Sequence, residues 1–146
     1  MRPDRILETI LYAADLDAAE AFYRDVLGLE PQSRAPGRQV FYRIGSQMLL
    51  VFNPDATAVP PPPGARLPVP PHGARGPGHV CFAATADEIE QWAARLAACG
   101  VEIEADCHWP VPEGAPDGSP GGRSIYFRDP AGNCLEFAEP RIWGLA

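Results

Sequence analysis

Basic residues are scarce in this sequence. Lys and Arg together number 12 against 19 Asp and Glu, which gives a net charge of −7 and a pI near 4.8. Without a basic patch or an Arg-rich helix, nucleic acid and anionic membrane surfaces are excluded as partners. No apolar run approaches the roughly 18 residues that span a bilayer, and residues 1–5 lack the apolar run of a signal peptide. We therefore expect a cytoplasmic protein without membrane contact.

Cysteine is also scarce. The four cysteines show neither C-x-x-C spacing nor the density of a small disulfide scaffold, so free thiols are expected. The 146 residues, 46% of them apolar, suffice for a hydrophobic core. We expect one domain over residues 1–146, either a single compact unit or two closely joined halves.

The chain repeats a pattern of about 60 residues. Two helical segments end at Gly28 and Gly100, and a strand-like run follows each glycine. Glu8 lies 20 residues before Gly28, and His79 lies 21 residues before Gly100. The two residues therefore open the two repeats at equivalent positions.

Periodicity and capping residues give the elements of each repeat. In the first we predict a strand at 6–13, a helix capped by Asp15 that ends at Gly28, and strands near 29–34, 39–44 and 47–52. In the second we predict a strand at 78–84, a helix that begins with the capping box Thr85-x-x-Glu88, and strands near 101–106, 123–128 and 133–138. The fold class is α+β, with two βαβββ modules, at about 4–54 and about 77–141, forming an open half-barrel cavity. A Pro-rich strap, about 53–78, joins them.

Three residues that can bind a metal interrupt apolar strands: Glu8, His79 and Glu136. Side chains alternate between the two faces of a strand, and the bulkier apolar set is expected to face the helix. All three residues then lie on the opposite face, which would line the cavity. Two carboxylates and one imidazole suit a divalent ion, so together they predict a metal site.

The sequence resembles the vicinal oxygen chelate superfamily, which includes glyoxalase I, extradiol dioxygenases and bleomycin-binding proteins. The resemblance covers nearly the whole chain. Three segments carry it: Asp15-Leu16 through Leu27-Gly28-Leu29, then Gly78-His79, and last Tyr126-Phe127-x-Asp129-Pro130-x-Gly132-Asn133-x-x-Glu136.

The resemblance implies a divalent ion, Zn, Ni, Mn or Fe, bound by Glu8, His79 and Glu136. The fourth ligand position of the family falls on Leu49 or Leu50, neither of which can bind a metal. Three protein ligands would leave open positions for a substrate that chelates through two adjacent oxygens.

The implied function is that of a metal-dependent enzyme of the glyoxalase or dioxygenase type that acts on a small molecule. A glyoxalase-like reaction needs a base beside the metal, and Glu136 or Glu8 could serve. The alternative is a metal-free protein that sequesters an aromatic or cationic compound, as bleomycin-binding members do. A homodimer is usual in the family.

Two loops and four aromatic residues complete the predicted cavity. The strap holds nine of the 18 prolines and should be stiff and partly polyproline II. Residues 106–122 could form a lid or a surface loop. His72 and His108 fall in these predicted loops, and we interpret both as solvent-exposed. The candidate cavity walls are Tyr12, Phe41, Trp109 and Tyr126.

Overall fold

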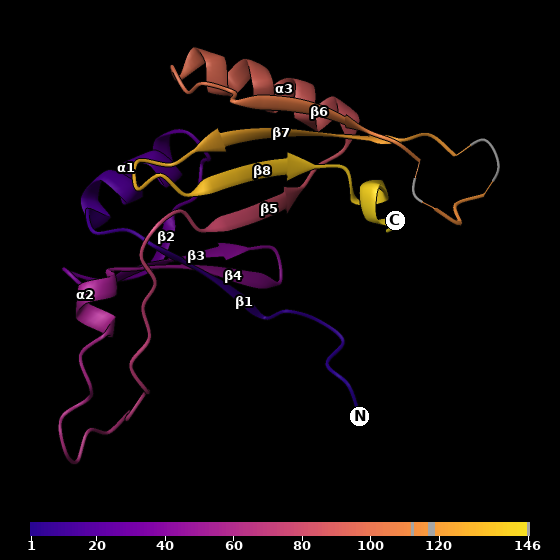
Figure 1. The fold of residues 1–146 in the computed structure, drawn as a ribbon. Helices are drawn as coiled ribbons and strands as arrows, with labels where there is room; N and C mark the ends of the chain where they lie inside the picture. The colour runs from indigo at the N-terminus through magenta and orange to yellow at the C-terminus, as the bar shows by residue number, and fades with distance from the viewer. Residues whose placement is uncertain (112, 117–118, 146) are drawn as a thin grey trace. The chain divides into compact units, whose positions relative to one another are not determined.

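Two four-stranded sheets, each with one long helix, form the fold in a computed structural model that describes residues 1–111, 113–116 and 119–145 (Figure 1). The first repeat contains β1 (Glu8–Tyr12), α1 (Leu16–Asp25), β2 (Pro31–Ala35), β3 (Gln39–Ile44) and β4 (Gln47–Phe52). The second contains β5 (His79–Ala83), α3 (Ala86–Ala98), β6 (Ala105–Trp109), β7 (Gly122–Arg128) and β8 (Cys134–Ala138). The short helix α2 (Pro54–Thr57) and a 3₁₀ helix (Pro140–Trp143) follow β4 and β8.

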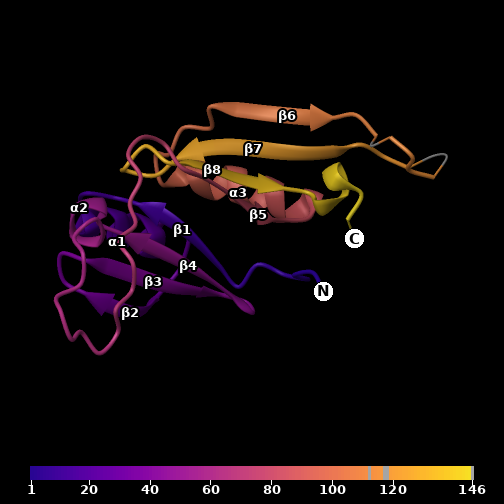
Figure 2. The same ribbon diagram turned by 60° about the horizontal axis from the view of Figure 1, so that its bottom comes forward.

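Both sheets have the same topology. The strand orders are β1-β4-β3-β2 and β5-β8-β7-β6, as Figure 2 shows. In each sheet the first strand pairs in parallel with the last, and the remaining pairs are antiparallel. This confirms the predicted α+β class with two βαβββ modules. The module boundaries and the half-barrel stay predictions.

The chain divides into two compact units. Unit 1 contains residues 1–78 and 129–133, and unit 2 contains residues 79–128 and the chain from Cys134 onward. The turn between β7 and β8 therefore belongs to unit 1, while the strands that it connects belong to unit 2. Each unit has its own core.

In unit 1, α1 covers one face of its sheet. The side chain of Asp15 caps the helix, accepting a 2.9 Å hydrogen bond from the backbone N–H of Ala18. Tyr23 on the helix packs against Tyr42 on β3, with ring centroids 5.2 Å apart. The buried strand residues on this face are Leu11, Val40, Tyr42, Leu49 and Val51. The face that carries Glu8 is the other one, as side-chain alternation predicts.

In unit 2, α3 covers one face of its sheet. The predicted capping box is present, since the Thr85 backbone N–H donates to Glu88 Oε2 at 2.7 Å and the Glu88 N–H donates to Thr85 Oγ1 at 3.3 Å. Trp92 on the helix stacks on Phe137 of β8 at 4.4 Å between centroids. Ile89 and Leu96 are fully buried. Glu136 therefore points away from α3, because neighbouring residues alternate between faces.

The prediction for β6 was wrong by about four residues. Gly100 adopts a left-handed φ of 71°, and the N–H of Val101 still bonds to the carbonyl of Leu96, so the chain is closing the helix where a strand was expected. The N–H of Glu104 makes the first bond to β7, and the strand runs from Ala105 to Trp109. The predicted lid is accordingly reduced to residues 110–121, of which 112, 117 and 118 lie outside the described residues.

The Pro-rich strap belongs entirely to unit 1, where it forms a long loop after α2 (Figure 1). Within the strap, the N–H of His72 donates a hydrogen bond to the carbonyl of Thr57. His72 is half-buried: its Nδ1 lies 2.8 Å from the Tyr12 hydroxyl, and its ring meets Phe52 edge-on. His72 does lie in a loop, but its interpretation as solvent-exposed was wrong, because aromatic neighbours on β1 and β4 cover part of the ring.

Among the described residues, no helix is both long enough and apolar enough to cross a membrane.

Candidate functional site

His79 and Glu136 form the centre of the candidate site in unit 2. The Nε2 atom of His79 lies 3.3 Å from Oε2 of Glu136. The His79 side chain is 51% exposed, whereas that of Glu136 is only 7% exposed. The other carboxylate oxygen, Oε1, is buried and has no hydrogen-bond partner among the described residues. A buried carboxylate oxygen without a partner is costly, so this position calls for a cation or a donor.

The tautomer of His79 follows from its second contact. Its Nδ1 lies 3.0 Å from the carbonyl oxygen of Cys134, and because a carbonyl can only accept, Nδ1 carries the proton. In the neutral ring, Nε2 then directs a lone pair at the Glu136 carboxylate. Two acceptors in this arrangement need a positive charge between them, either a proton on Nε2 or a metal ion.

The geometry of this pair fits a metal ion. Two ligand atoms each about 2.1 Å from one ion stand roughly 3–3.4 Å apart. The 3.3 Å separation of the His79 and Glu136 atoms lies in that range. The hydrogen bond from Nδ1 to a backbone carbonyl is also the support that metal-binding histidines usually have.

The buried Glu136 carboxylate affects both of its cross-strand neighbours. Cys81 on β5 and Tyr126 on β7 are its Cα partners. Burial raises the pKa of the Cys81 thiol to about 12, and the negative charge of Glu136 adds to the increase. Burial, with a contribution from Glu136, also raises the pKa of the Tyr126 hydroxyl. Both groups therefore stay protonated at neutral pH.

Two of the predicted cavity walls share this face of the sheet. Tyr126 stacks on the His79 ring, with centroids 6.3 Å apart. Trp109 donates its indole N–H to Ser124 Oγ at 2.8 Å, and Ser124 is two residues from Tyr126 on β7. Sequence reasoning missed Ser124, although its alternation with Tyr126 placed it on this face.

His108 lies on the other face of the sheet. It is on β6, not in a loop as predicted, because the strand begins later than expected. Its Cα partner is Arg123, which directly precedes Ser124 on β7. Because neighbouring residues face opposite sides of a strand, Arg123 and His108 lie on the face opposite to Glu136. His108 is thus not a candidate acid or base at this site.

Glu8, the third predicted ligand, lies on β1 in unit 1 and is exposed. Its Cα partner is Met48 on β4, just as that of His79 is Cys134 on β8. Two residues further along the last strands, Leu50 is the counterpart of Glu136. The register thus selects Leu50, not Leu49, as the empty fourth ligand position, and Leu50 is 6% exposed. Phe41, another predicted wall, is the Cα partner of Leu50.

Within either unit, the described residues contain no group of three or more His, Cys, Asp or Glu side chains that could hold a metal ion. The three-ligand site takes Glu8 from unit 1 and His79 and Glu136 from unit 2. It stays a prediction, with the His79–Glu136 pair as the part whose geometry is established.

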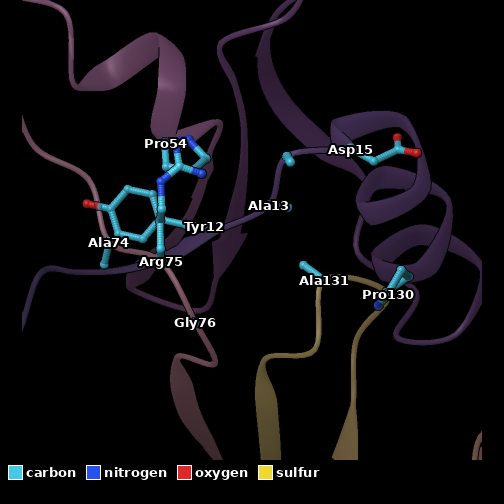
Figure 3. A pocket seen from close by; sticks show the side chains of 10 residues that line it. Tyr12, Ala13, Asp15, Pro54, Ala74, Arg75, Gly76, Pro130 and Ala131 are labelled. Carbon is cyan, nitrogen blue, oxygen red and sulfur yellow. The ribbon is translucent and has the colours of Figure 1, made fainter.

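A separate pocket of about 300 Å³ opens in unit 1 (Figure 3). It lies where β1 ends, and its lining includes Tyr12, Asp15, Pro54 and Arg75. The guanidinium of Arg75 pairs with the carboxylate of Asp55, and both side chains are exposed. Tyr12, one of the four predicted cavity walls, therefore lines this pocket of unit 1. Sequence reasoning gave no signal for Arg75.

The sequence profile of the Glyoxalase/Bleomycin resistance protein/Dioxygenase superfamily matches residues 5–137. The chain belongs to this superfamily. No curated protein matches the sequence. The matched range includes Glu8, His79 and Glu136, so all three candidate ligands lie within the part that defines membership in the superfamily.

Three solved structures are similar to this chain. The structure of a lactoylglutathione lyase from Agrobacterium tumefaciens is 44% identical, covers 99% of this chain and 100% of its own, and has a TM-score of 0.86. A glyoxalase/bleomycin resistance protein/dioxygenase from Nocardioides is 23% identical over 95% of this chain and 85% of its own, with a TM-score of 0.68. A fosfomycin resistance protein from Listeria monocytogenes is 21% identical over 95% of this chain and 92% of its own, with a TM-score of 0.57. The last two show the fold alone.

Proposed function

We propose that this superfamily member is a metal-dependent lyase of the glyoxalase type. The observation that carries the proposal is the His79–Glu136 pair, in which an imidazole nitrogen lone pair and a buried carboxylate face each other 3.3 Å apart. The 44% identity to a lactoylglutathione lyase over nearly the whole chain supports this chemistry within the superfamily. The proposed reaction is the interconversion of lactoylglutathione, or a related thioester, and the hemithioacetal of glutathione with a 2-oxoaldehyde.

The proposed ligands are Glu8, His79 and Glu136, and the ion is one of Zn, Ni, Mn or Fe. When bound, the ion would stabilise negative charge on two adjacent oxygens of the substrate. Two carboxylates and one neutral imidazole balance its charge of +2. Nε2 is the atom of His79 that would bind the ion, since Nδ1 is hydrogen-bonded to the carbonyl of Cys134.

Glu136 is the proposed base. The reaction is redox-neutral overall and moves two protons. The C–H bond beside sulfur breaks and a C–H bond forms at the former carbonyl carbon, while the hydroxyl proton beside sulfur moves to the former carbonyl oxygen, so that a thioester with an adjacent hydroxyl results. A carboxylate oxygen can carry the proton between the two carbons, and Oε1 of Glu136 is a suitable atom because it is buried and makes no geometrically defined hydrogen bond among the described residues. Burial keeps water from competing for the proton. Glu8 is the alternative base.

The test is an assay of thioester formation in a mixture of glutathione and a 2-oxoaldehyde, together with elemental analysis of the purified protein. We expect about one equivalent of a divalent ion, activity that chelation removes and metal restores, and a loss of roughly 10²–10⁴-fold in kcat for Glu136→Gln at saturating metal. A metal-loaded wild type that forms no thioester would contradict the proposed reaction.

A metal-free sequestering protein is the second candidate. The buried, aliphatic Leu50 favours this candidate. It stands at the fourth ligand position of the family and cannot bind a metal, so one ligand of the complete set is missing. In that case the wild type would contain no metal as purified, would bind added metal weakly, and would take up an aromatic or cationic compound in calorimetry. Metal content thus separates the two candidates before any assay.

The predicted partners are the small-molecule substrate and a second copy of the chain. Light scattering at high protein concentration tests the homodimer, and a monomer mass there would contradict it.

A further inference from the structure

The turn that connects β7 to β8, Asp129–Asn133, is built into unit 1 by hydrogen bonds. Tyr23 on α1 donates its hydroxyl to Asp129 Oδ2 at 2.9 Å. The other oxygen of Asp129 accepts from the backbone N–H groups of Ala131 and Asn133, each at 2.9 Å. Asp129 and Asn133 are 4% and 1% exposed. The two ends of this turn, Asp129 and Asn133, are therefore buried and hydrogen-bonded, while Pro130 and Ala131 between them are exposed.

The side chain of Asn133 uses all of its strong donors in this junction. Its Nδ2 donates to the carbonyl of Tyr12 at 3.1 Å and to Asp129 Oδ2 at 2.8 Å. Its Oδ1 accepts from the backbone N–H of Gly78 at 2.9 Å. An amide group has two N–H donors and one acceptor oxygen, so asparagine suits this position where aspartate would not.

Gly78 leaves room for the same contact. A Cβ atom at this residue would lie 2.9 Å from Cδ2 of Leu11 and 3.0 Å from Oδ1 of Asn133. Any larger residue would push the amide of Asn133 or the side chain of Leu11 away. The two family motifs, at Gly78 and at 129–133, are thus two sides of one contact.

Each of the three backbone segments that Asn133 joins leads to a candidate ligand. Gly78 directly precedes His79, Asn133 lies three residues before Glu136, and Tyr12 lies four residues after Glu8 on β1. The contact between Gly78 and Asn133 also fixes the starting points of β5 and β8. Those two strands begin at the Cα partners His79 and Cys134. That register brings the side chains of His79 and Glu136 together.

We propose that Asn133 is a positioning residue for the metal site: its carboxamide fixes the ends of the strand segments that carry Glu8, His79 and Glu136. The proposal rests on the proposed function, because it presumes that these residues bind a metal. Asn133 itself touches neither metal nor substrate. Its effect is on the spacing of the ligands and therefore on metal affinity.

The experiment measures metal affinity by calorimetry and the visible absorption of the Co²⁺-loaded protein for wild type, Asn133→Asp and Gly78→Ala. Asn133→Asp keeps the acceptor for Gly78 but loses both donors. Gly78→Ala disturbs the same contact from the other side. We expect each variant to bind Co²⁺ roughly 10–100-fold more weakly, the loss typical for groups that support metal ligands, with a changed absorption band.

Two matched controls separate positioning from general stability. Tyr23→Phe removes a hydrogen bond of the same junction without touching Asn133, and Leu96→Ala lowers the thermal midpoint through the core of unit 2. Both should keep wild-type Co²⁺ affinity and spectrum. Amide hydrogen exchange, measured without metal, should accelerate at the start of β5 and β8 only in the Asn133 and Gly78 variants.

The outcomes distinguish the two proposals. A wild type that binds no divalent ion would overturn the metal site, and the positioning role with it. A wild type that binds metal, with unchanged affinity and spectrum in Asn133→Asp and Gly78→Ala, would overturn the positioning role alone. Equal losses in Leu96→Ala would also overturn it, because lowered stability would then explain the effect.

Discussion

His79 and Glu136 meet across β5 and β8 although they are not cross-strand partners. His79 is paired with Cys134, and Glu136 is paired with Cys81. The imidazole reaches the carboxylate diagonally, with 3.3 Å between Nε2 and Oε2, because its Nδ1–H is held by the carbonyl of Cys134. The backbone of Cys134 thus orients the ring towards Glu136.

His79→Ala should abolish specific metal binding. The imidazole supplies Nε2, the one nitrogen ligand that we propose, and even supporting groups cost roughly 10–100-fold in metal affinity when lost, so losing a ligand should cost more. Calorimetric titration with a divalent ion measures the effect. Leu49→Ala is the matched control, since Leu49 is buried on the helix-facing side of its sheet and should change stability but not affinity. Equal, weak binding by wild type and His79→Ala would favour the sequestering function.

Leu50→Glu should tighten metal binding by supplying the missing carboxylate at the fourth position. Without metal, the same change should lower the free energy of unfolding by on the order of several kcal/mol, because it places a charge where a buried leucine lies. Thermal unfolding with and without a divalent ion checks both effects. A variant whose stability does not respond to metal more strongly than that of the wild type would show that Leu50 is not a ligand position.

Cys81 should be alkylated slowly in the metal-free protein, because burial of the thiol raises its pKa. With a pKa of about 12, roughly one thiol in ten thousand is ionised at pH 8, and the rate should rise about tenfold per pH unit below pH 12. The negative charge of Glu136 raises this pKa by disfavouring the thiolate, so Glu136→Gln should lower it and speed the reaction. Iodoacetamide labelling with peptide mass analysis measures the rates, with exposed Cys99 as internal reference. Unchanged labelling of Cys81 in Glu136→Gln would contradict this coupling.

Replacement of Pro60 to Pro63 by Gly and Ser should lower the free energy of unfolding by about 0.4–1 kcal/mol per proline where the native conformation suits proline, because the unfolded chain gains entropy. The hydrogen bond between Thr57 and His72 closes the loop that contains these prolines, so the residues on either side of the loop should keep their structure. Urea denaturation checks the loss. An unchanged midpoint would mean that these prolines are not held in one conformation in the folded protein.

Local physics determined much of the fold from the sequence. Asp15 and Thr85 begin helices because their side chains accept the free N–H groups of a first turn, and both caps are present as predicted. The alternation along β1, β5 and β8 correctly placed Glu8, His79 and Glu136 on the faces away from the helices. The repeat and the family resemblance correctly gave two βαβββ modules.

The predictions that were wrong concerned features that depend on contacts between residues far apart in the sequence. The start of β6 could not be read locally, because the chain after Gly100 is still bonded to α3 and the strand begins only where Glu104 meets Tyr126. His72 was predicted to be solvent-exposed because nothing near it in the sequence reveals Tyr12 and Phe52 as its neighbours.

The sequence by itself determined the elements, their faces and the residue types available for chemistry. Only the tertiary structure decided that Leu50 and not Leu49 matches Glu136, that Nε2 of His79 faces the carboxylate, and that Asn133 joins three backbone segments. Caps, turns and alternation are set by residues a few positions apart, so the sequence displays them directly. Register, tautomer and burial are set by partners up to 121 positions away, and these come together only when the chain folds.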